Sequence, residues 1–158
     1  MGAVVGKAIR GLSFVLMSVG LVFVVGMRRK SPPVLNAVRR LSRATKRFPL
    51  KKAGTSGSDA SVVRHIGRKT GKSYETPVRA VRTADGFAVA LPYGPNTDWL
   101  KNVISSGRAT IVYQGEVYAV DQPQVVPLAE ESSSFTRGNR LAHRVFGITD
   151  VLKVRRAD

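Results

Sequence analysis

The chain has 158 residues, a length typical of one domain with a short appendage. Hydrophobic residues make up 43% of the sequence and charged residues 23%, which provides a folded core and excludes general disorder. The sequence contains no cysteine, so disulfides, thiolate nucleophiles and cysteine-ligated metal centres are excluded. Its two histidines, His65 and His143, are too few for a histidine-rich metal centre, and no metal site is expected.

The net charge of +16 is concentrated near the N-terminus. Residues 1–52 hold 12 lysines and arginines and no acidic residue, whereas residues 53–158 hold 14 basic and 10 acidic residues. The second part therefore carries only +4. This distribution argues against a basic nucleic-acid-binding protein and indicates a basic N-terminal arm on a mildly basic body.

An uncharged apolar run, GLSFVLMSVGLVFVVGM, occupies residues 11–27 and predicts a membrane anchor helix within residues 1–30. The run is short for a span, but flanking Lys7, Arg10 and Arg28 extend its reach by snorkelling. A cleaved signal peptide and a buried core helix are the alternatives, although the sequence has no small-x-small cleavage site. Most basic residues follow the run, so the positive-inside rule predicts a single-pass protein of the cell membrane with its body in the cytoplasm.

Residues 31–58 are predicted to form a basic amphipathic helix and a linker. Ser31-Pro32-Pro33 ends the first helix, and residues 34–48 form the second, whose arginines and lysines surround an apolar edge. Residues 1–52 are therefore expected to contact anionic membrane lipid, the alternative for the second helix being ordinary packing of that edge on the body. The small residues of segment 53–58 predict a flexible joint.

The remaining residues, 59–158, are rich in short strands. Alternating or apolar segments predict strands over residues 60–66, 74–82, 86–91, 109–113, 116–120, 124–126 and 148–154, with a hairpin turn at Gln114-Gly115. A helix is expected from Asp98 to Ser106, capped by Asn96 or Thr97 and closed by Gly107. Residues 128–146 read as helical and broken around Gly138. The predicted fold is mainly β, an antiparallel barrel with flanking helices.

The segment Gly67-Arg68-Lys69-Thr70-Gly71-Lys72 resembles a P-loop but has one residue too few between its glycines. A P-loop also opens a helix, whereas the residues after Ser73 include Pro77, so nucleoside triphosphate hydrolysis is excluded. As a turn between strands, the segment still predicts an anion site, because two glycines let backbone N–H groups converge and Arg68, Lys69 and Lys72 supply charge. The alternative is a polar turn with solvated charges.

A second candidate segment begins at the rigid turn Pro92-Tyr93-Gly94 and continues into the predicted helix. Trp99 and Asn102 are three residues apart and share one face of that helix. Core packing is the alternative for Trp99. His65 is interpreted as a partly buried structural histidine, and His143 is given no role.

Together these two segments resemble the deazaflavin-dependent nitroreductases, split-β-barrel, FMN-binding-like oxidoreductases of actinobacteria that use coenzyme F-420. The turn Gly67–Gly71 with Pro77-Val78 is similar to that family's signature turn. Trp99 and Asn102 match the family's W-x-x-N helix, and the strand at 109–112 with the hairpin to 116–120 follows in order. The resemblance covers about residues 60–127.

The resemblance implies a split β-barrel over residues 59–158 that binds a deazaflavin. Arg68, Lys69 and Thr70 would contact the phosphate and acidic tail of F-420, together with Gly67, Gly71 and Lys72. Pro92, Tyr93 and Gly94 would lie beside the ring, Trp99 and Asn102 near it, and Tyr93 is the candidate proton donor.

The predicted function is a membrane-anchored, F-420-dependent oxidoreductase that transfers hydride to a hydrophobic acceptor, a quinone or an unsaturated lipid. Flavin mononucleotide (FMN) is the alternative cofactor. The alternative functions are a non-catalytic lipid- or fatty-acid-binding barrel at the membrane and, disfavoured by the charge distribution, a nucleic-acid-binding protein. A homodimer is left open.

Overall fold

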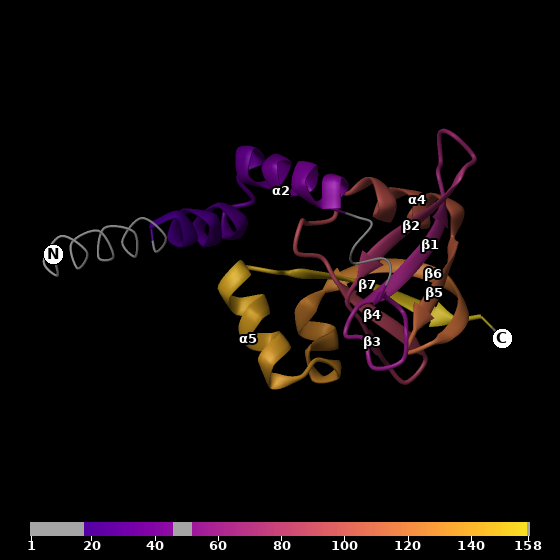
Figure 1. Cartoon of the computed structure of the whole chain (residues 1–158). Helices are drawn as coiled ribbons and strands as arrows, with labels where there is room; N and C mark the ends of the chain where they lie inside the picture. The colour runs from indigo at the N-terminus through magenta and orange to yellow at the C-terminus, as the bar shows by residue number, and fades with distance from the viewer. Residues whose placement is uncertain (1–17, 46–51, 158) are drawn as a thin grey trace, which may run out of the picture.

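The computed structural model describes residues 18–45 and 52–157. Within them, seven strands form one antiparallel sheet in the order β2-β1-β5-β6-β7-β4-β3 (Figure 1). The strands are β1 (Ser61–Ile66), β2 (Ser73–Val78), β3 (Ala80–Arg82), β4 (Gly86–Ala90), β5 (Arg108–Tyr113), β6 (Glu116–Pro127) and β7 (Asp150–Arg156). The expectation of a mainly β domain with flanking helices is confirmed.

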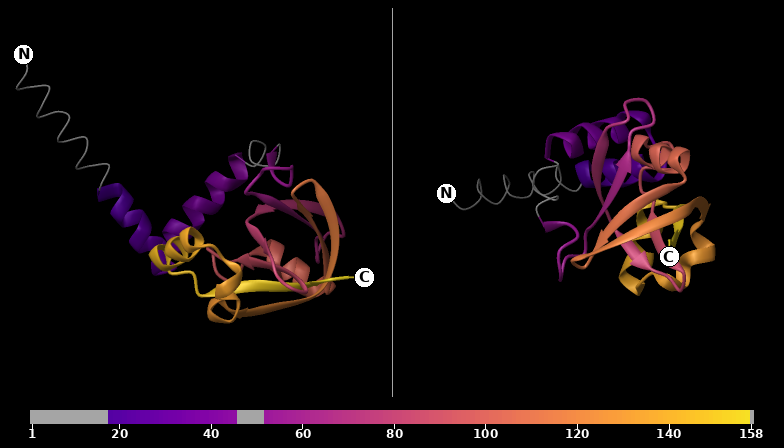
Figure 2. Two further views of the ribbon diagram at one scale, coloured as in Figure 1. Left: turned by 90° about the horizontal axis from the view of Figure 1, so that it is seen from below. Right: turned by 90° about the vertical axis from the view of Figure 1, so that its right-hand side faces the viewer.

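The sheet curls into a half-barrel (Figure 2). Its two edge strands, β2 and β3, follow each other in the chain and are separated only by Arg79. Helix α4 (Asp98–Ser106) contributes Leu100 and Val103 to the core enclosed by the curve, where they join Phe87 from β4 and Ile111 from β5. Burial of these apolar side chains is the main stabilising contribution to the barrel.

Local sequence signals account for the turns that close the barrel. Gln114 and Gly115 both have positive φ, 52° and 89°, as a two-residue type I′ hairpin between β5 and β6 requires. Gly107 ends α4 in the left-handed conformation, and its N–H donates to the carbonyls of Val103 and Ile104. Both predicted features, the hairpin and the helix from Asp98 to Ser106, are confirmed.

Three predicted boundaries are wrong. The strand expected over residues 74–82 is interrupted at Arg79, and the two strands expected within 116–126 are one strand, β6, with an irregularity between Asp121 and Gln124. The helical segment is interrupted at residues 135–136, between the 3₁₀ helix η1 (Leu128–Ser134) and α5 (Arg137–Phe146). Thr136 causes this restart, because its hydroxyl accepts a hydrogen bond from the Asn139 N–H and caps α5, so Gly138 lies inside the helix.

The N-terminal part forms two helices that meet at an angle beside α5 (Figure 2). The first covers residues 18–28, and after a turn at Lys30 (φ 52°) α2 (Pro32–Thr45) begins, so the predicted break at the prolines is confirmed. Phe23 meets the ring of Phe146 edge-on with centroids 6.4 Å apart, and Arg28 Nη1 donates to the Arg144 carbonyl at 3.3 Å. These contacts join the N-terminal helices to the C-terminal helix of the barrel.

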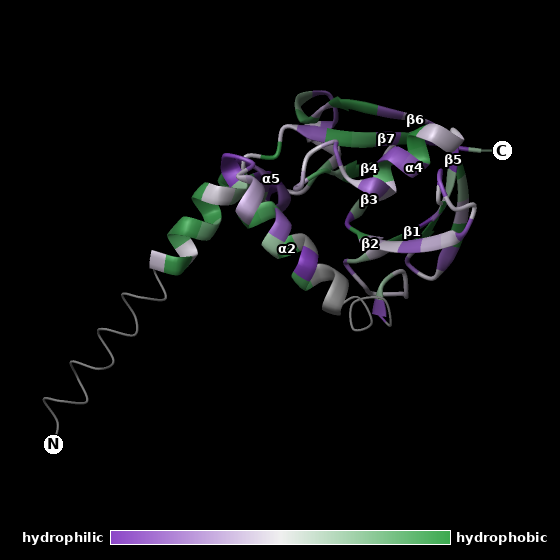
Figure 3. Ribbon diagram, turned by 90° about the horizontal axis from the view of Figure 1, so that it is seen from above, coloured by the Kyte–Doolittle hydropathy of each residue, from purple (hydrophilic) through white to green (hydrophobic). Residues whose placement is uncertain are grey.

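The first helix is largely apolar along its length (Figure 3), and its exposed apolar side chains lie on more than one side of it. Val19, Leu21 and Val22 are 61%, 64% and 66% exposed, so the interpretation as a core helix is wrong for these residues, while Met27 at the helix end is buried. No helix among residues 18–45 and 52–157 has the length and apolarity that a membrane crossing needs. Residues 11–17 of the expected span and 46–48 of the second predicted helix lie outside the described residues.

The segment expected as a flexible joint, residues 53–58, is bound to the β5–β6 turn. The Gly57 N–H donates to Gln114 Oε1 at 2.7 Å, and Gln114 Nε2 donates to the Ser58 carbonyl at 2.9 Å. The Gly115 N–H donates to the Gly54 carbonyl, so the backbone contributes a further bond. The turn residues of one hairpin therefore fix the chain that enters β1.

Candidate functional site

A cleft of about 1040 Å³ runs along the β1–β2 hairpin. Its walls come from this hairpin, from the turn before α4 and the start of that helix, from three residues of α5 and from Asn36 of α2. The structure brings most of the predicted site residues together in it, namely Gly67, Arg68, Lys69, Thr70, Pro92, Tyr93, Trp99 and Asn102. Gly71, Lys72 and Gly94 lie in the same two turns but do not line the cleft. A smaller hollow of about 480 Å³ lies at the β3–β4 turn.

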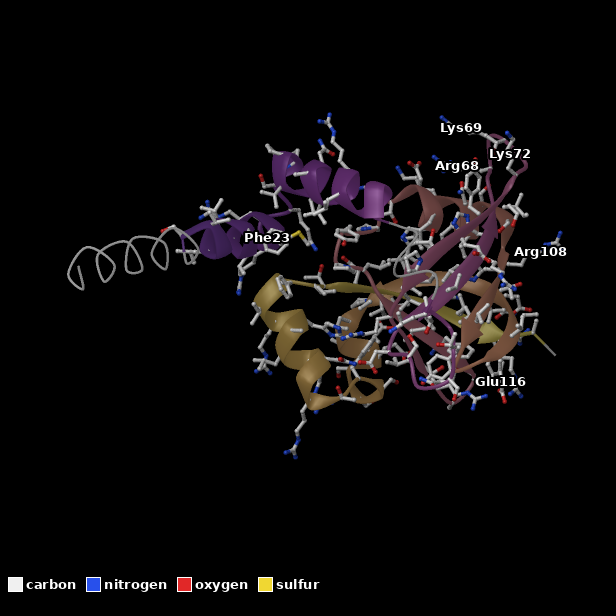
Figure 4. All side chains as sticks on the ribbon, in the orientation of Figure 1. Phe23, Arg68, Lys69, Lys72, Arg108 and Glu116 are labelled. Atoms are coloured by element: carbon white, nitrogen blue, oxygen red, sulfur yellow. The ribbon has the colours of Figure 1, made fainter. Side chains whose placement is uncertain are left out.

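The basic hairpin, residues 67–72, forms one end of the cleft. The turn is closed by its own backbone, because the Gly67 N–H donates to the Lys72 carbonyl and the Thr70 and Gly71 N–H groups donate to the Gly67 carbonyl. These three N–H groups are therefore bonded within the turn and do not converge on an anion, as the sequence had predicted they would. The side chains of Lys69 and Lys72 lie at the hairpin tip, and that of Arg68 lies nearer α4 (Figure 4), so anion binding at this hairpin stays a prediction that rests on these cations.

Arg68 attaches this hairpin to α4. Its Nη2 lies 3.0 Å from Asp98 Oδ1, and its Nη1 donates to Asn102 Oδ1 at 2.8 Å. Its backbone N–H donates to the same Asn102 oxygen at 3.2 Å. The hydrogen bond from Arg68 lowers the pKa of Asp98 below its ordinary value, against a smaller opposing effect of desolvation. Arg68 therefore holds two elements together in addition to supplying charge.

Behind Arg68 lies a buried polar pair that sequence reasoning did not connect. Asn102 and His65 are 7% and 5% exposed, and Asn102 Nδ2 lies 3.2 Å from His65 Nδ1. The other ring nitrogen, His65 Nε2, lies 3.1 Å from Thr76 Oγ1, and the ring stacks on Tyr74. Thr76 is a cleft residue that the sequence analysis missed. Thr76 comes two residues after Tyr74 on β2, so the two side chains share one face of the strand. This spacing was the sequence signal that could have placed both at the cleft.

The turn before α4 forms the middle of the cleft. It is closed by a hydrogen bond from the Gly94 N–H to the Leu91 carbonyl, with Gly94 at φ 72°, and Lys30 Nζ donates to the Pro92 carbonyl at 3.4 Å. Burial lowers the pKa of Lys30, and the charge of Asp150 opposes this. Tyr93 and Trp99 line the cleft here, and Trp99 also packs against the barrel core, as the core-packing interpretation expected, while its contact with a cofactor stays a prediction.

Two buried polar atoms at the cleft have no hydrogen-bond partner within the described part of the chain, Thr97 Oγ1 and His143 Nδ1. Thr97 is the predicted N-cap of α4 and has cap backbone geometry, but its hydroxyl does not bond to the helix. His143 on α5 is 6% exposed and meets Phe135 edge-on. Burial lowers its pKa, and the positive charge of Arg79 lowers it further. The ring is therefore neutral at pH 7.

His143 is a second residue whose place in the cleft was not foreseen. It belongs to a basic helix far along the chain, and only the fold brings α5 against the end of β2. In the residues that the structure describes, no three His, Asp or Glu side chains form a group that could hold a metal ion. The polar groups of the cleft are thus cations, hydroxyls, amides, two imidazoles and the Asp98 carboxylate.

No family model matches the sequence, and no curated protein sequence matches it. Several solved structures are similar to the computed one at 9–14% sequence identity. An F420-H2 dependent reductase is 13% identical, with a TM-score of 0.43, over 60% of this chain and 94% of the other. HutZ, the heme storage protein from Vibrio cholerae, is 10% identical, with a TM-score of 0.44, over 75% of this chain and 91% of the other.

A third similar structure comes from Clostridium acetobutylicum. It is a protein related to general stress protein 26, of the pyridoxinephosphate oxidase family, and is 9% identical with a TM-score of 0.46. The match covers 73% of this chain and 83% of the other. At these identities and TM-scores no residue of this chain is assigned a role by equivalence.

Proposed function

We propose that this protein is an F-420-dependent oxidoreductase whose cofactor occupies the cleft of the half-barrel. The observation that carries the proposal is the continuity of one cleft from a cationic hairpin to aromatic side chains. Its volume of about 1040 Å³ is at the upper end of the range for small-molecule sites. A cofactor with a planar ring at one end and a phosphate and polyglutamate tail at the other has the same polarity.

The residues present fit such a group. Lys69 and Lys72 are exposed at the hairpin tip and would contact the phosphate and acidic tail through charge-assisted hydrogen bonds. Tyr93 and Trp99 offer aromatic faces for the ring, and buried Thr97 Oγ1 offers an unpaired hydrogen-bonding atom. FMN is the alternative occupant, because it also joins a flat ring system to a phosphate.

The deazaflavin would supply hydride transfer, and the protein would bind, orient and exclude water. The acceptor we propose is hydrophobic, a quinone or an unsaturated lipid, entering beside the ring. Tyr93 is the candidate proton donor because it carries a hydroxyl and lines the same cleft as Trp99. The neutral His143 at the α5 end is a second group able to hydrogen-bond to an acceptor oxygen.

We also propose that the N-terminal segment holds the barrel at the cytoplasmic face of the cell membrane. The exposed apolar side chains of the first helix support this, because Val19, Leu21 and Val22 are left uncovered by the barrel. Arg28 and Arg29 stand at the end of that helix and are suited to anionic lipid headgroups. An acceptor dissolved in the bilayer would then be close to the cleft.

The second candidate function is a non-catalytic barrel that binds a lipid or fatty acid. The same exposed apolar helix favours it, since a lipid-facing surface needs no redox cofactor. In that case a fatty acid would occupy the apolar part of the cleft, and Lys69 and Lys72 would at most bind its carboxylate.

Titration of the full-length protein with F-420, followed by tryptophan fluorescence, tests the proposal. Trp99 is the only tryptophan in the chain and lines the cleft, so cofactor binding should quench its emission saturably. A parallel titration with FMN identifies the alternative cofactor. Unchanged emission with both, together with saturable binding of oleate, would favour the lipid-binding function instead.

A further inference from the structure

A chain of four side chains leads from the basic hairpin to the middle of the cleft. Arg68 donates two hydrogen bonds to Asn102 Oδ1, from its backbone N–H at 3.2 Å and from Nη1 at 2.8 Å. Asn102 Nδ2 is 3.2 Å from His65 Nδ1, and His65 Nε2 is 3.1 Å from Thr76 Oγ1. The two central members, Asn102 and His65, are buried, so their hydrogen bonds are shielded from water.

The chemistry of Arg68 gives this chain one direction. A guanidinium and a backbone N–H can only donate, so the Asn102 atom that they contact must be the amide oxygen. The amide nitrogen then faces His65 and donates to Nδ1, which must be unprotonated. The ring proton therefore lies on Nε2 and is donated to the Thr76 oxygen.

This direction decides what Thr76 can do. Its oxygen already accepts from His65, so its own hydroxyl proton needs an acceptor elsewhere. Among the residues that the structure describes, Thr76 Oγ1 has no second hydrogen-bond partner, and the half-buried side chain lines the cleft. The acceptor for the Thr76 hydroxyl proton must therefore come from a molecule that enters the cleft.

We propose that Thr76 donates a hydrogen bond to an acceptor atom of the cleft ligand, a carbonyl oxygen or ring nitrogen of a flat heteroaromatic system. Arg68, Asn102 and His65 are positioning residues that act through Thr76. The identity of the ligand as a deazaflavin rests on the proposed function. The direction of the hydrogen-bond chain does not, because it follows from the donors and acceptors alone.

Asn102→Asp reverses the chain, with almost no change in shape, at a pH where His65 is neutral. A carboxylate at position 102 accepts only, so a neutral His65 presents Nδ1–H to it and leaves Nε2 as an acceptor. Thr76 would then donate to His65, and its hydroxyl proton would be lost to the ligand. Thr76→Val removes the hydroxyl and keeps a β-branched side chain suited to a strand, whereas Thr76→Ser keeps the hydroxyl.

The experiment has two readouts on the full-length protein. NMR of ¹⁵N-labelled histidine should show His65 as the Nε2–H tautomer in the wild type and as the Nδ1–H tautomer in Asn102→Asp. In the Trp99 fluorescence titration, Thr76→Val and Asn102→Asp should each weaken F-420 binding about three- to tenfold. Thr76→Ser should stay near wild type, as should the control Thr110→Val, a half-buried threonine on β5 outside the cleft.

An Nδ1–H tautomer in the wild type would overturn the inference, and so would unchanged F-420 affinity in Thr76→Val. Either result would leave the proposed function standing as long as the wild type binds F-420. Failure of the wild type to bind F-420 would overturn the proposed function and the ligand assigned to Thr76. In that case the tautomer would still decide whether the chain runs in the stated direction.

Discussion

Arg68 Nη2 lies 3.0 Å from Asp98 Oδ1, so the central cation of the basic hairpin is paired with a carboxylate at the start of α4. The hydrogen bond to Arg68 lowers the pKa of Asp98, and the positive charges of Lys101 and Lys69 lower it further. An anionic ligand at the hairpin has to share or displace that carboxylate. The ion pair therefore competes with anion binding while it fixes the hairpin on the helix.

Asp98→Asn is expected to strengthen F-420 binding, because the guanidinium loses its competing charge. Asp98 is highly exposed, and exposed pairs contribute at most about 1 kcal/mol, so the gain should not exceed about fivefold. Glu75→Gln is the matched control, since it removes one charge from the same hairpin and leaves Arg68 untouched. Weaker binding in Asp98→Asn would mean that the ion pair preorganises the site more than it competes.

The paired substitution of Lys69 and Lys72 by alanine should reduce F-420 affinity about tenfold or more at low ionic strength. The loss should shrink as salt is added, because screening weakens the wild-type attraction. Arg108→Ala with Arg137→Ala removes the same charge from exposed positions outside the cleft and should have a much smaller effect. Equal losses of F-420 affinity in the two double variants would mean that the hairpin is a polar turn with solvated charges and not an anion site. Thermal unfolding should be unchanged in both.

His143→Leu should stabilise the fold, because it removes a buried nitrogen without a partner in the described structure. A gain of about 1 kcal/mol in the free energy of unfolding at pH 7 is expected. The wild type should lose stability as the pH falls below 6.5, since unfolded His143 takes up a proton near that ordinary value and the folded ring resists it. Thermal unfolding between pH 7.5 and 5 measures both effects.

In His143→Leu this part of the pH dependence should disappear, whereas Arg137→Leu on the exposed side of the same helix should retain it. A destabilised His143→Leu protein would show that the imidazole has a partner in solution, such as a bound water.

Replacing Val19, Leu21 and Val22 by serine should reduce sedimentation with anionic phospholipid vesicles, because the three most exposed apolar side chains of the first helix are lost. The variant should also become more readily released by salt, leaving only electrostatic attraction. Substitution is preferable to deletion of residues 1–30, since Phe23 and Lys30 contact the barrel domain. Leu141→Ser, on an exposed position of α5, is the control. If the triple variant still sediments with the vesicles as the wild type does, attachment through residues 18–28 is overturned.

Much of the fold could be predicted because its signals are local. The left-handed residues Gln114-Gly115 and Gly107 mark a hairpin and a helix end, and the β-branched pair Val62-Val63 marks strand β1. The break in the second helical segment was misplaced because a glycine is a weaker signal than the Thr136 cap that restarts α5. Two strands were predicted in place of β6 because Pro123 interrupts the pattern, whereas the structure takes up the interruption as a local irregularity with Gln122 at positive φ.

The candidate site was predictable only in part. The hairpin and the Trp99–Asn102 helix carry recognisable spacing, and the fold does bring them to one cleft. The pairing of Arg68 with Asp98 and of Asn102 with His65 could not be derived, because these contacts span 30 and 37 positions and depend on how α4 lies against β1. His143 carries no sequence signal, since its burial follows from the docking of α5.

The contacts of Gln114 with Gly57 and Ser58 define where the folding unit begins. A recombinant fragment started at residue 59 would leave the amide of Gln114 and the Gly115 N–H without these partners. A fragment started at residue 53 would keep those bonds and give a better-behaved sample for crystallisation. The same bonds should slow amide hydrogen exchange at Gly57, turning an apparent spacer into one of the more protected loops of the molecule.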